Sequence, residues 1–154
     1  MMVPMKREDI CVISSSGGHL TEALAATTRI KDRCVYISSN DEVAHLRLEG
    51  QRAFFILNFH RNAFLFLLNG AQSALLVARL RPRVVITTGA GMVVPFAILS
   101  RMIGARLIFI ETAACTERPS GTGRILGRFA SKVFVQWQGL IKSYPGAIIG
   151  GPLF

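Results

Sequence analysis

Glycine, serine and histidine residues gather in one short stretch of the chain, Cys11–Leu24, which reads CVISSSGGHLTEAL. An apolar β-branched run precedes them and a helix-like pattern follows. The residues of this stretch that could contact a ligand are Ser15, Ser16, Gly17, Gly18 and His19. Small residues let the backbone approach an anion closely, and the first N–H groups of a following helix point toward such a loop. The stretch therefore predicts an anion-binding loop, although a tight strand-to-helix turn would use the same residues.

A second glycine-rich stretch, TTGAGMVVPFAIL, follows another apolar run. Thr88 carries a hydroxyl group, Gly89 and Gly91 leave the backbone open, and Pro95 is tolerated in the first turn of a helix. In a wound parallel sheet this loop would lie near the first one, and two loops on one crevice indicate a large polar ligand. Close packing of a helix on a strand also favours glycine and is the alternative for this stretch.

Glu111 ends an apolar run, LIFIE, where a carboxylate is unexpected unless it is solvated or paired. At a crevice it could accept hydrogen bonds from a sugar hydroxyl or orient a neighbouring group. An ion pair with Arg118 or Arg124 is the structural alternative. No metal site is predicted, because His45 and His60 have no partners at ligand spacing.

Neither common nucleotide fingerprint fits the first stretch, because it is not GxxxxGK[ST] and lacks the full GxGxxG. Asp41 nevertheless follows the second apolar run about where a ribose-binding carboxylate stands in dinucleotide folds. A small dinucleotide-binding enzyme therefore stays open as an alternative. An Asn-Asp pair at a strand end is also typical of a plain turn.

The composition describes a folded basic protein. Its 154 residues are 51% hydrophobic, and 18 Lys and Arg stand against 9 Asp and Glu, for a formal net charge of +9. Such a charge favours a partner with phosphates or an anionic surface. Nucleic acid is not expected, because no recognised binding motif accompanies the charge. Three cysteines without a CxxC pair and a start without an apolar signal core indicate a reducing, cytosolic environment.

The apolar stretch 62–78, NAFLFLLNGAQSALLVA, carries no charge. It is shorter than the roughly 20 residues that a membrane span needs, and polar residues interrupt it, so we do not predict a transmembrane helix. The residues favour a buried helix over one that lies in a membrane interface. Arginines beside apolar segments would give an interfacial helix a basic margin, or form an ordinary solvated rim: Arg47, Arg52, Arg61, Arg79, Arg81, Arg83 and Arg101.

The elements that must position these residues alternate along the chain. Strands are predicted within 9–15, 33–39, 52–59, 83–89, 105–112 and 132–137, with a last short run in 146–151. Helices are predicted over Leu20–Ile30, Phe64–Leu80, Val93–Ile103 and Gly123–Ser131. Alternating strands and helices are typical of a parallel sheet covered by helices. We therefore predict one Rossmann-like α/β domain over 1–154, a doubly wound parallel sheet whose ligand lies beyond the carboxyl ends of the strands.

Four stretches together resemble the asparagine-linked glycosylation protein 14 family, with its bacterial capsule and exopolysaccharide counterparts. They are SSSGGHLTEAL, ITTGAGMVVPFAILSRMIGARLIFIET, GTGRILGRFASKVFVQW and SYPGAIIGG, in the family's order. The resemblance implies the amino-terminal half of a GT-B glycosyltransferase of the MurG type. It also implies a small separate partner that carries the carboxyl-terminal half and the UDP-sugar site, and no cofactor.

By this resemblance the chain binds a polyprenyl-diphosphate-linked acceptor at the cytoplasmic face of the plasma membrane, as a peripheral protein on an anionic surface. The pair would transfer one sugar with inversion, and the chain alone would be inactive. The first loop, with Ser16, Gly17 and Gly18, would hold the acceptor diphosphate, and the second loop would lie on the acceptor side of the crevice. His19 is the first candidate for the base and Glu111 the second. A non-catalytic membrane scaffold for a transferase is a further alternative.

Overall fold

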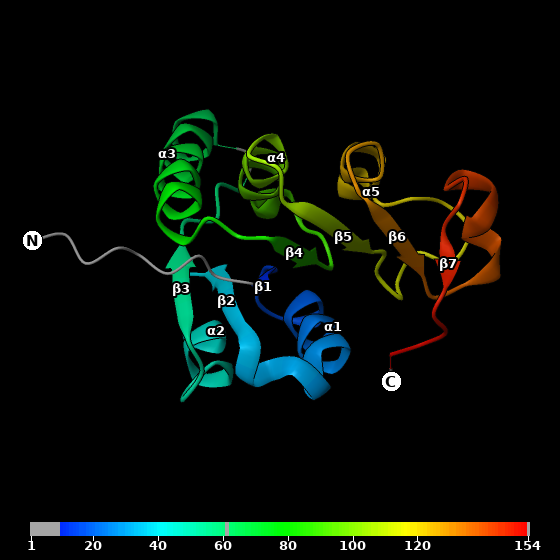
Figure 1. Cartoon of the computed structure of the whole chain (residues 1–154), viewed down its shortest axis with the longest axis horizontal. Helices are drawn as coiled ribbons and strands as arrows, with labels where there is room; N and C mark the ends of the chain where they lie inside the picture. The colour runs from blue at the N-terminus through cyan, green and yellow to red at the C-terminus, as the bar shows by residue number, and fades with distance from the viewer. Residues whose placement is uncertain (1–9, 61, 154) are drawn as a thin grey trace, which may run out of the picture.

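A seven-stranded parallel sheet forms the centre of the molecule (Figure 1). The computed structural model describes residues 10–60 and 62–153, so Asp9 and Arg61 lie outside the described residues. The strands are β1 Ile10–Ile13, β2 Cys34–Ser39, β3 Ala53–Ile56, β4 Val84–Thr87, β5 Arg106–Ile110, β6 Lys132–Val135 and β7 Ile148–Ile149. Their order across the sheet is β3-β2-β1-β4-β5-β6-β7, and every neighbouring pair is parallel. This order confirms the predicted doubly wound α/β fold.

Helices cover both faces of the sheet. On one face lie α1 (Gly18–Thr27) and α2 (Glu42–Arg47), and on the other lie α3 (Ala63–Leu80), α4 (Val94–Met102) and α5 (Gly121–Leu126) (Figure 1). Short 3-10 turns complete the connections: η1 Thr28–Arg33, η2 Gly91–Val93 and η3 Gln138–Ser143. Because helices cover both faces of the sheet, a ligand can approach at the loops at the strand ends.

The core lies on both faces because alternate residues of a strand point to opposite sides. In β1, Cys11 and Ile13 pack toward α3 and α4, whereas Val12 packs toward α1 with Leu20. All six residues of β2 are buried, which explains why the sequence shows a continuous apolar run instead of an alternating pattern.

Three helices differ from their prediction by more than one residue. α1 was predicted over Leu20–Ile30, but it begins at Gly18 and ends at Thr27, where the 3-10 turn η1 follows. α2 was not predicted, because its six residues are too few to show a helical period; Asp41 caps its N-terminus. α5 was predicted over Gly123–Ser131, but it begins at Gly121 and ends at Leu126. The hydroxyl of Ser120 accepts a hydrogen bond from the N–H of Gly123, and this cap places the start of α5 before the predicted one.

The expectation of a buried helix over 62–78 is wrong for most of α3. Only Asn69, Ser73, Val77 and Leu80 of this helix are buried. Phe64, Leu67 and Leu75 are exposed by 67%, 68% and 71%. By length and composition α3 could cross a membrane, as no other helix of the described chain could, but its buried side packs on the protein. The outer side of α3 is therefore an apolar surface without a cover.

Candidate functional site

The site lies where the winding of the sheet reverses direction. β1 pairs with β4, and Ile13 lies beside Thr87 at their carboxyl ends. From β1 the chain winds outward to β2 and β3, and from β4 it winds the opposite way to β5 and β6. The loops that leave two such strands diverge and open a crevice, the usual ligand site of a doubly wound sheet. The two glycine-rich stretches are these two loops.

Residues at and after the end of β2 hold the first loop through hydrogen bonds. The N–H of Ser16 donates to Oγ of Ser39 at 3.0 Å, and the hydroxyl of Ser39 donates to Oδ2 of Asp41 at 2.6 Å. Gly17 has a φ of 80°, a backbone conformation that side chains other than glycine rarely adopt. The chain then turns directly into α1 at Gly18, so the first turn of α1 faces the crevice.

The second loop lies against His19. The hydroxyl of Thr88 donates to the backbone carbonyl of His19 at 2.8 Å. A Cβ added at Gly89 would lie 3.6 Å from Cε1 of His19, an ordinary van der Waals contact, so the loop passes beside the imidazole; the φ of 104° is what favours glycine here. The expected proximity of the two loops is confirmed. Thr88 is 1% exposed and Thr87 is fully buried, so these threonines shape the loops instead of lining an open surface.

The loop after β3 supports the second loop from the side of α3. The side chain of Asn69 on α3 donates to the carbonyls of Leu57 and Met92. Gly91 faces the ring of Phe59 in that loop. A buried amide on α3 therefore joins the loops that follow β3 and β4.

His19 has a neighbour that sequence reasoning missed. Glu22 stands one turn further along α1, and its Oε2 lies 3.9 Å from Nδ1 of His19. The His19 side chain is 30% exposed and that of Glu22 is 3% exposed. Residues three apart on a helix share one face, so the spacing H-L-T-E was the signal that could have identified Glu22.

Glu22 also fixes the loop that follows β5. Its Oε1 accepts hydrogen bonds from the N–H of Ala113 at 2.7 Å, the hydroxyl of Thr112 at 3.1 Å and the amide of Gln136 at 3.3 Å. A pocket of ≈ 440 Å³ opens between this loop and the first turn of α1. Its lining residues are Gly18, His19, Glu22, Thr112, Ala113 and Ala114.

Glu111 directly precedes Thr112 of this pocket and has no exposed surface. Its Oε1 accepts from the N–H of Thr112, and its Oε2 accepts from the N–H of Ser120 and the hydroxyl of Tyr144. Burial and the hydrogen bond to Glu111 raise the pKa of Tyr144 well above its usual value, so the phenol stays protonated and donates. These donors, and not Arg118 or Arg124, are the hydrogen-bond partners of the carboxylate.

Asp41, the ribose-binding candidate of the dinucleotide hypothesis, caps α2. Its Oδ1 accepts from the N–H of Ala44 at 2.9 Å, and its Oδ2 accepts from Ser39. Partial burial works against ionisation, but the hydrogen bonds from Ser39 and Ala44 outweigh it and lower the pKa of Asp41. Both oxygens of the Asp41 carboxylate thus accept hydrogen bonds within the protein.

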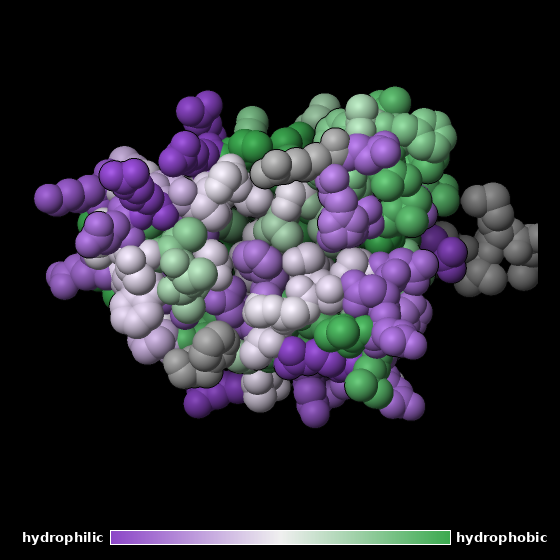
Figure 2. All heavy atoms as spheres, turned by 180° about the vertical axis from the view of Figure 1, so that it is seen from behind, coloured by the Kyte–Doolittle hydropathy of each residue, from purple (hydrophilic) through white to green (hydrophobic). Residues whose placement is uncertain are grey.

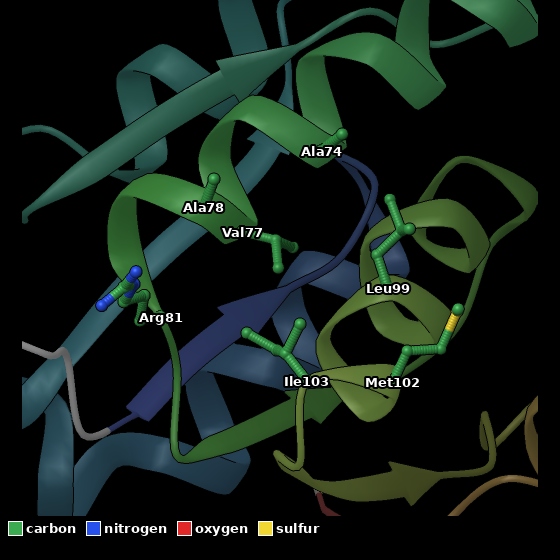
Figure 3. Close-up of a pocket in the computed structure, with 7 residues that line it drawn as sticks. All are labelled: Ala74, Val77, Ala78, Arg81, Leu99, Met102 and Ile103. Atoms are coloured by element: carbon green, nitrogen blue, oxygen red, sulfur yellow. The ribbon is translucent and has the colours of Figure 1, made fainter.

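A cavity larger than the His19 pocket lies away from the crevice, between α3 and α4 (Figure 3). It has a volume of ≈ 680 Å³, and its lining side chains are apolar except for Arg81. Within residues 10–60 and 62–153, no three His, Cys, Asp or Glu side chains are grouped so that they could hold a metal ion. The His19 pocket, in contrast, is lined by polar groups of His19, Glu22 and Thr112.

Comparison with known proteins finds similarity to proteins of oligosaccharide biosynthesis and to N-acetylglucosamine transferases. A family model described as "Oligosaccharide biosynthesis protein Alg14 like" matches residues 57–153. The human protein named "UDP-N-acetylglucosamine transferase subunit ALG14" is 24% identical in an alignment that covers 97% of this chain and 85% of the human protein. The Prochlorococcus marinus UDP-N-acetylglucosamine–N-acetylmuramyl-(pentapeptide) pyrophosphoryl-undecaprenol N-acetylglucosamine transferase is 27% identical; the alignment covers 86% of this chain and 40% of that enzyme.

Solved structures show the same fold. MurG of Acinetobacter baumannii matches with a TM-score of 0.70 at 16% identity, over 85% of this chain and 42% of MurG. A UDP-N-acetylglucosamine 2-epimerase of Rickettsia bellii matches with a TM-score of 0.73 at 9% identity, over 96% of this chain and 46% of the epimerase. The chain thus spans less than half the length of these proteins. The predicted resemblance to the amino-terminal half of a GT-B glycosyltransferase is confirmed.

Proposed function

The chain belongs to the Alg14-like family of oligosaccharide biosynthesis proteins, and from this membership we propose that it is the acceptor-binding subunit of a two-subunit inverting glycosyltransferase. The pair transfers a sugar from a UDP-sugar to a polyprenyl-diphosphate-linked glycan in capsule or exopolysaccharide biosynthesis. The observation that carries the proposal is that the first turn of α1 and the imidazole of His19 open into one pocket at the switch point of the sheet.

The first turn of α1 suits the diphosphate of the acceptor. The N–H groups of Gly18, His19 and Leu20 belong to the first turn of a helix, where amides have no acceptor within the helix, and they carry the positive end of the helix dipole. A Cβ added at Gly17 or Gly18 would have no neighbour within 4 Å, so the space beside these two glycines is open. The half-buried Ser15 and Ser16 supply hydroxyl groups beside it. The Gly89–Gly91 loop closes the other side of the crevice.

His19 is the proposed general base. Its Nε2 takes the proton of the acceptor hydroxyl while the hydroxyl oxygen attacks the anomeric carbon of the donor sugar. The bond between that carbon and the diphosphate oxygen breaks, UDP leaves with the bonding electrons, and the configuration inverts. An imidazole is suited to this step near neutral pH. Glu111, with both oxygens occupied and no exposed surface, is proposed to position the loop above it.

A separate partner subunit is proposed to carry the UDP-sugar site. The human relative, of which this chain covers 85%, is named a transferase subunit, and this chain matches 42% of MurG. A GT-B active site lies between two Rossmann-like halves. The proposal therefore assigns the acceptor to this chain and the donor to its partner.

The outer side of α3 is proposed to contact an anionic membrane at its cytoplasmic face. Apolar side chains gather over α3, in the upper right of Figure 2, and they include Phe64, Leu67 and Leu75. Arg79 and Arg81 stand at the C-terminal end of the same helix. An apolar helix side with basic residues at its margin is typical of a protein that lies on a membrane without crossing it.

Sugar transfer by the reconstituted pair tests the proposed function. The chain, its candidate partner, and the two together are assayed with polyprenyl-diphosphate-linked acceptor and a panel of UDP-sugars. We expect turnover by the pair only, and a loss of about 10²- to 10⁴-fold in kcat for His19→Ala, the usual contribution of a general base. Turnover by the chain alone would overturn the two-subunit arrangement. An unchanged rate for His19→Ala would leave this chain with a docking role only.

A further inference from the structure

We propose that Glu22 is the positioning residue for His19: its Oε2 accepts a hydrogen bond from Nδ1–H, so that the imidazole keeps its proton on Nδ1 and Nε2 is left unprotonated toward the acceptor hydroxyl. This inference rests on the proposed role of His19 as the base. A neutral imidazole carries its proton on one of two nitrogens, and only the other nitrogen can accept a proton. The group that contacts Nδ1 determines which of the two nitrogens carries the proton.

Two buried polar atoms without a partner face each other on α1. Among the described side chains, Nδ1 of His19 and Oε2 of Glu22 are buried and make no hydrogen bond. They lie 3.9 Å apart, beyond hydrogen-bond distance. Leaving such buried groups unpaired is unfavourable, which favours a movement that joins them. Catalytic hydrogen bonds are often long in a ligand-free enzyme and shorten in the reacting complex.

The two oxygens of Glu22 face different partners. Oε1 accepts from Thr112, Ala113 and Gln136, and these three donors fix the carboxylate in one orientation. Oε2 is thereby held on the side of His19. The loop after β5 and the end of β6 thus hold a carboxylate that belongs to α1.

The second loop fixes the imidazole from the opposite direction. A Cβ added at Gly89 would lie 3.6 Å from Cε1 of the ring, so this loop lies beside the imidazole, and Thr88 donates to the backbone carbonyl of His19. The ring is therefore confined between Gly89 and Glu22. With Nδ1 facing Glu22, Nε2 is the nitrogen available to the pocket.

If Glu22 only held the loop after β5, it would need Oε1 alone. The variant Glu22→Gln separates this structural role from the positioning of His19. The single oxygen of the glutamine is held by the three donors at the Oε1 position, so its NH₂ group takes the place of Oε2. That group donates to Nδ1, which makes Nδ1 the acceptor and moves the imidazole proton to Nε2. The substitution keeps the loop contacts and reverses the tautomer.

The experiment reads the tautomer of His19 by ¹⁵N NMR and the kinetics of the reconstituted pair. We expect the proton on Nδ1 in the natural protein and on Nε2 in Glu22→Gln. The kcat of Glu22→Gln should fall by about 10²- to 10⁴-fold, the range for a general base, with the KM for acceptor within a few-fold. Thr112→Val removes one donor from Oε1 and leaves Oε2 unchanged, so it should keep the natural tautomer.

Three results would overturn the inference: a proton on Nε2 of His19 in the natural protein, an unchanged tautomer in Glu22→Gln, or an unchanged kcat in Glu22→Gln while His19→Ala loses activity. The tautomer of the natural protein decides the case even where Glu22→Gln does not fold. Failure of the proposed function is a different outcome, because the pair would then keep its rate in His19→Ala.

Discussion

Glu111 and His19 occupy opposite environments. Three donors hold the Glu111 carboxylate, and none of its surface is exposed. His19 keeps 30% of its side chain exposed at the pocket. A proton acceptor must reach its substrate, and this requirement favours His19 as the base. Glu111 instead ties the end of β5 to the N-terminus of α5 and to Tyr144.

Glu111→Gln should lower stability and spare the reaction. Both carboxylate oxygens accept hydrogen bonds from backbone N–H groups, so the NH₂ group of glutamine faces a donor in either orientation. One buried N–H then loses its acceptor, at a cost of about 1–3 kcal/mol in the free energy of unfolding. Urea unfolding measures this loss, and kcat per folded pair should stay within a few-fold.

The exposed Glu117 of the same loop provides the control, because Glu117→Gln should change stability by less than about 0.5 kcal/mol. A folded Glu111→Gln variant whose kcat falls as far as that of His19→Ala would assign the base to Glu111.

At the residue scale the sequence identified Gly18 and His19, two of the six residues that line the pocket, and missed its carboxylate, Glu22. The two glycine loops and His19 could be identified because each follows an apolar run that predicts a strand. Glu22 could not be identified with equal confidence, since a glutamate inside a helix is commonly a solvated residue. Its role depends on Thr112, Ala113 and Gln136, which are distant in the sequence. For Asp41 the sequence left a ribose ligand and a plain turn open, and the structure shows a helix cap, because α2 is too short to be predicted.

At the scale of elements, α5 depends on a glycine that no other residue can replace. A Cβ at Gly123 would meet the hydroxyl of Tyr144 and Oε2 of Glu111 at distances that force them apart. Gly123→Ala should therefore break this buried hydrogen bond and lower the free energy of unfolding by about 1–3 kcal/mol, as overpacking does. Thermal or urea unfolding measures the change.

Gly121 in the same helix is the matched control. A Cβ there has no neighbour within 4 Å, so Gly121→Ala should keep or raise stability, by up to about 1 kcal/mol. Equal effects at the two glycines would contradict the packing of α5 on Tyr144.

α3 should govern binding to membranes. Leu67 and Leu75 are exposed by 68% and 71%, and burying a leucine in an apolar phase contributes about 1.5–3 kcal/mol. The double variant Leu67→Glu, Leu75→Glu should bind vesicles with anionic lipids at least about 10-fold more weakly, without loss of the folded state. Co-sedimentation with vesicles measures the binding.

Leu46 lies on α2, on the opposite face of the sheet, and is exposed by 74%. Leu46→Glu makes the same chemical change and should leave vesicle binding unaltered. A similar loss for Leu46→Glu would contradict a membrane surface at α3.

The elements could be predicted to different degrees, for physical reasons. The central strands are apolar over their whole length because both faces are covered, and this made them visible in the sequence. The apolar pattern of α3 predicted the length of the helix correctly but not its exposure to solvent. The exposure depends on how the helix packs on the sheet and on its neighbours. The start of α5 depends on the Ser120 cap, and its packing depends on Tyr144; no periodicity reveals either.

At the scale of the whole molecule, the sheet order and the charge act together. The order β3-β2-β1-β4-β5-β6-β7 brings the loops after β1 and β4 to one crevice, and the net charge of +9 favours anionic ligands at its surface. The crevice is one side of the active site in the proposed pair. The central claim is that this side recognises the diphosphate of a lipid-linked acceptor.

Gly18→Asp offers a direct test of that claim. The added side chain has open space, and a carboxylate at a helix N-terminus favours the helix, so the variant should fold as stably as the natural protein. The carboxylate would occupy the proposed place of the diphosphate and repel it.

The measurement is calorimetric binding of a polyprenyl-diphosphate-linked sugar to the chain in detergent, beside the matched polyprenyl monophosphate, a UDP-sugar and NAD. We expect a Kd for the diphosphate acceptor of about 1 μM, corresponding to about −8 kcal/mol, and a loss of at least about 10-fold in Gly18→Asp. The UDP-sugar and NAD should not bind. Equal affinity of the natural protein and Gly18→Asp for the acceptor, or binding of NAD without binding of the acceptor, would contradict the account.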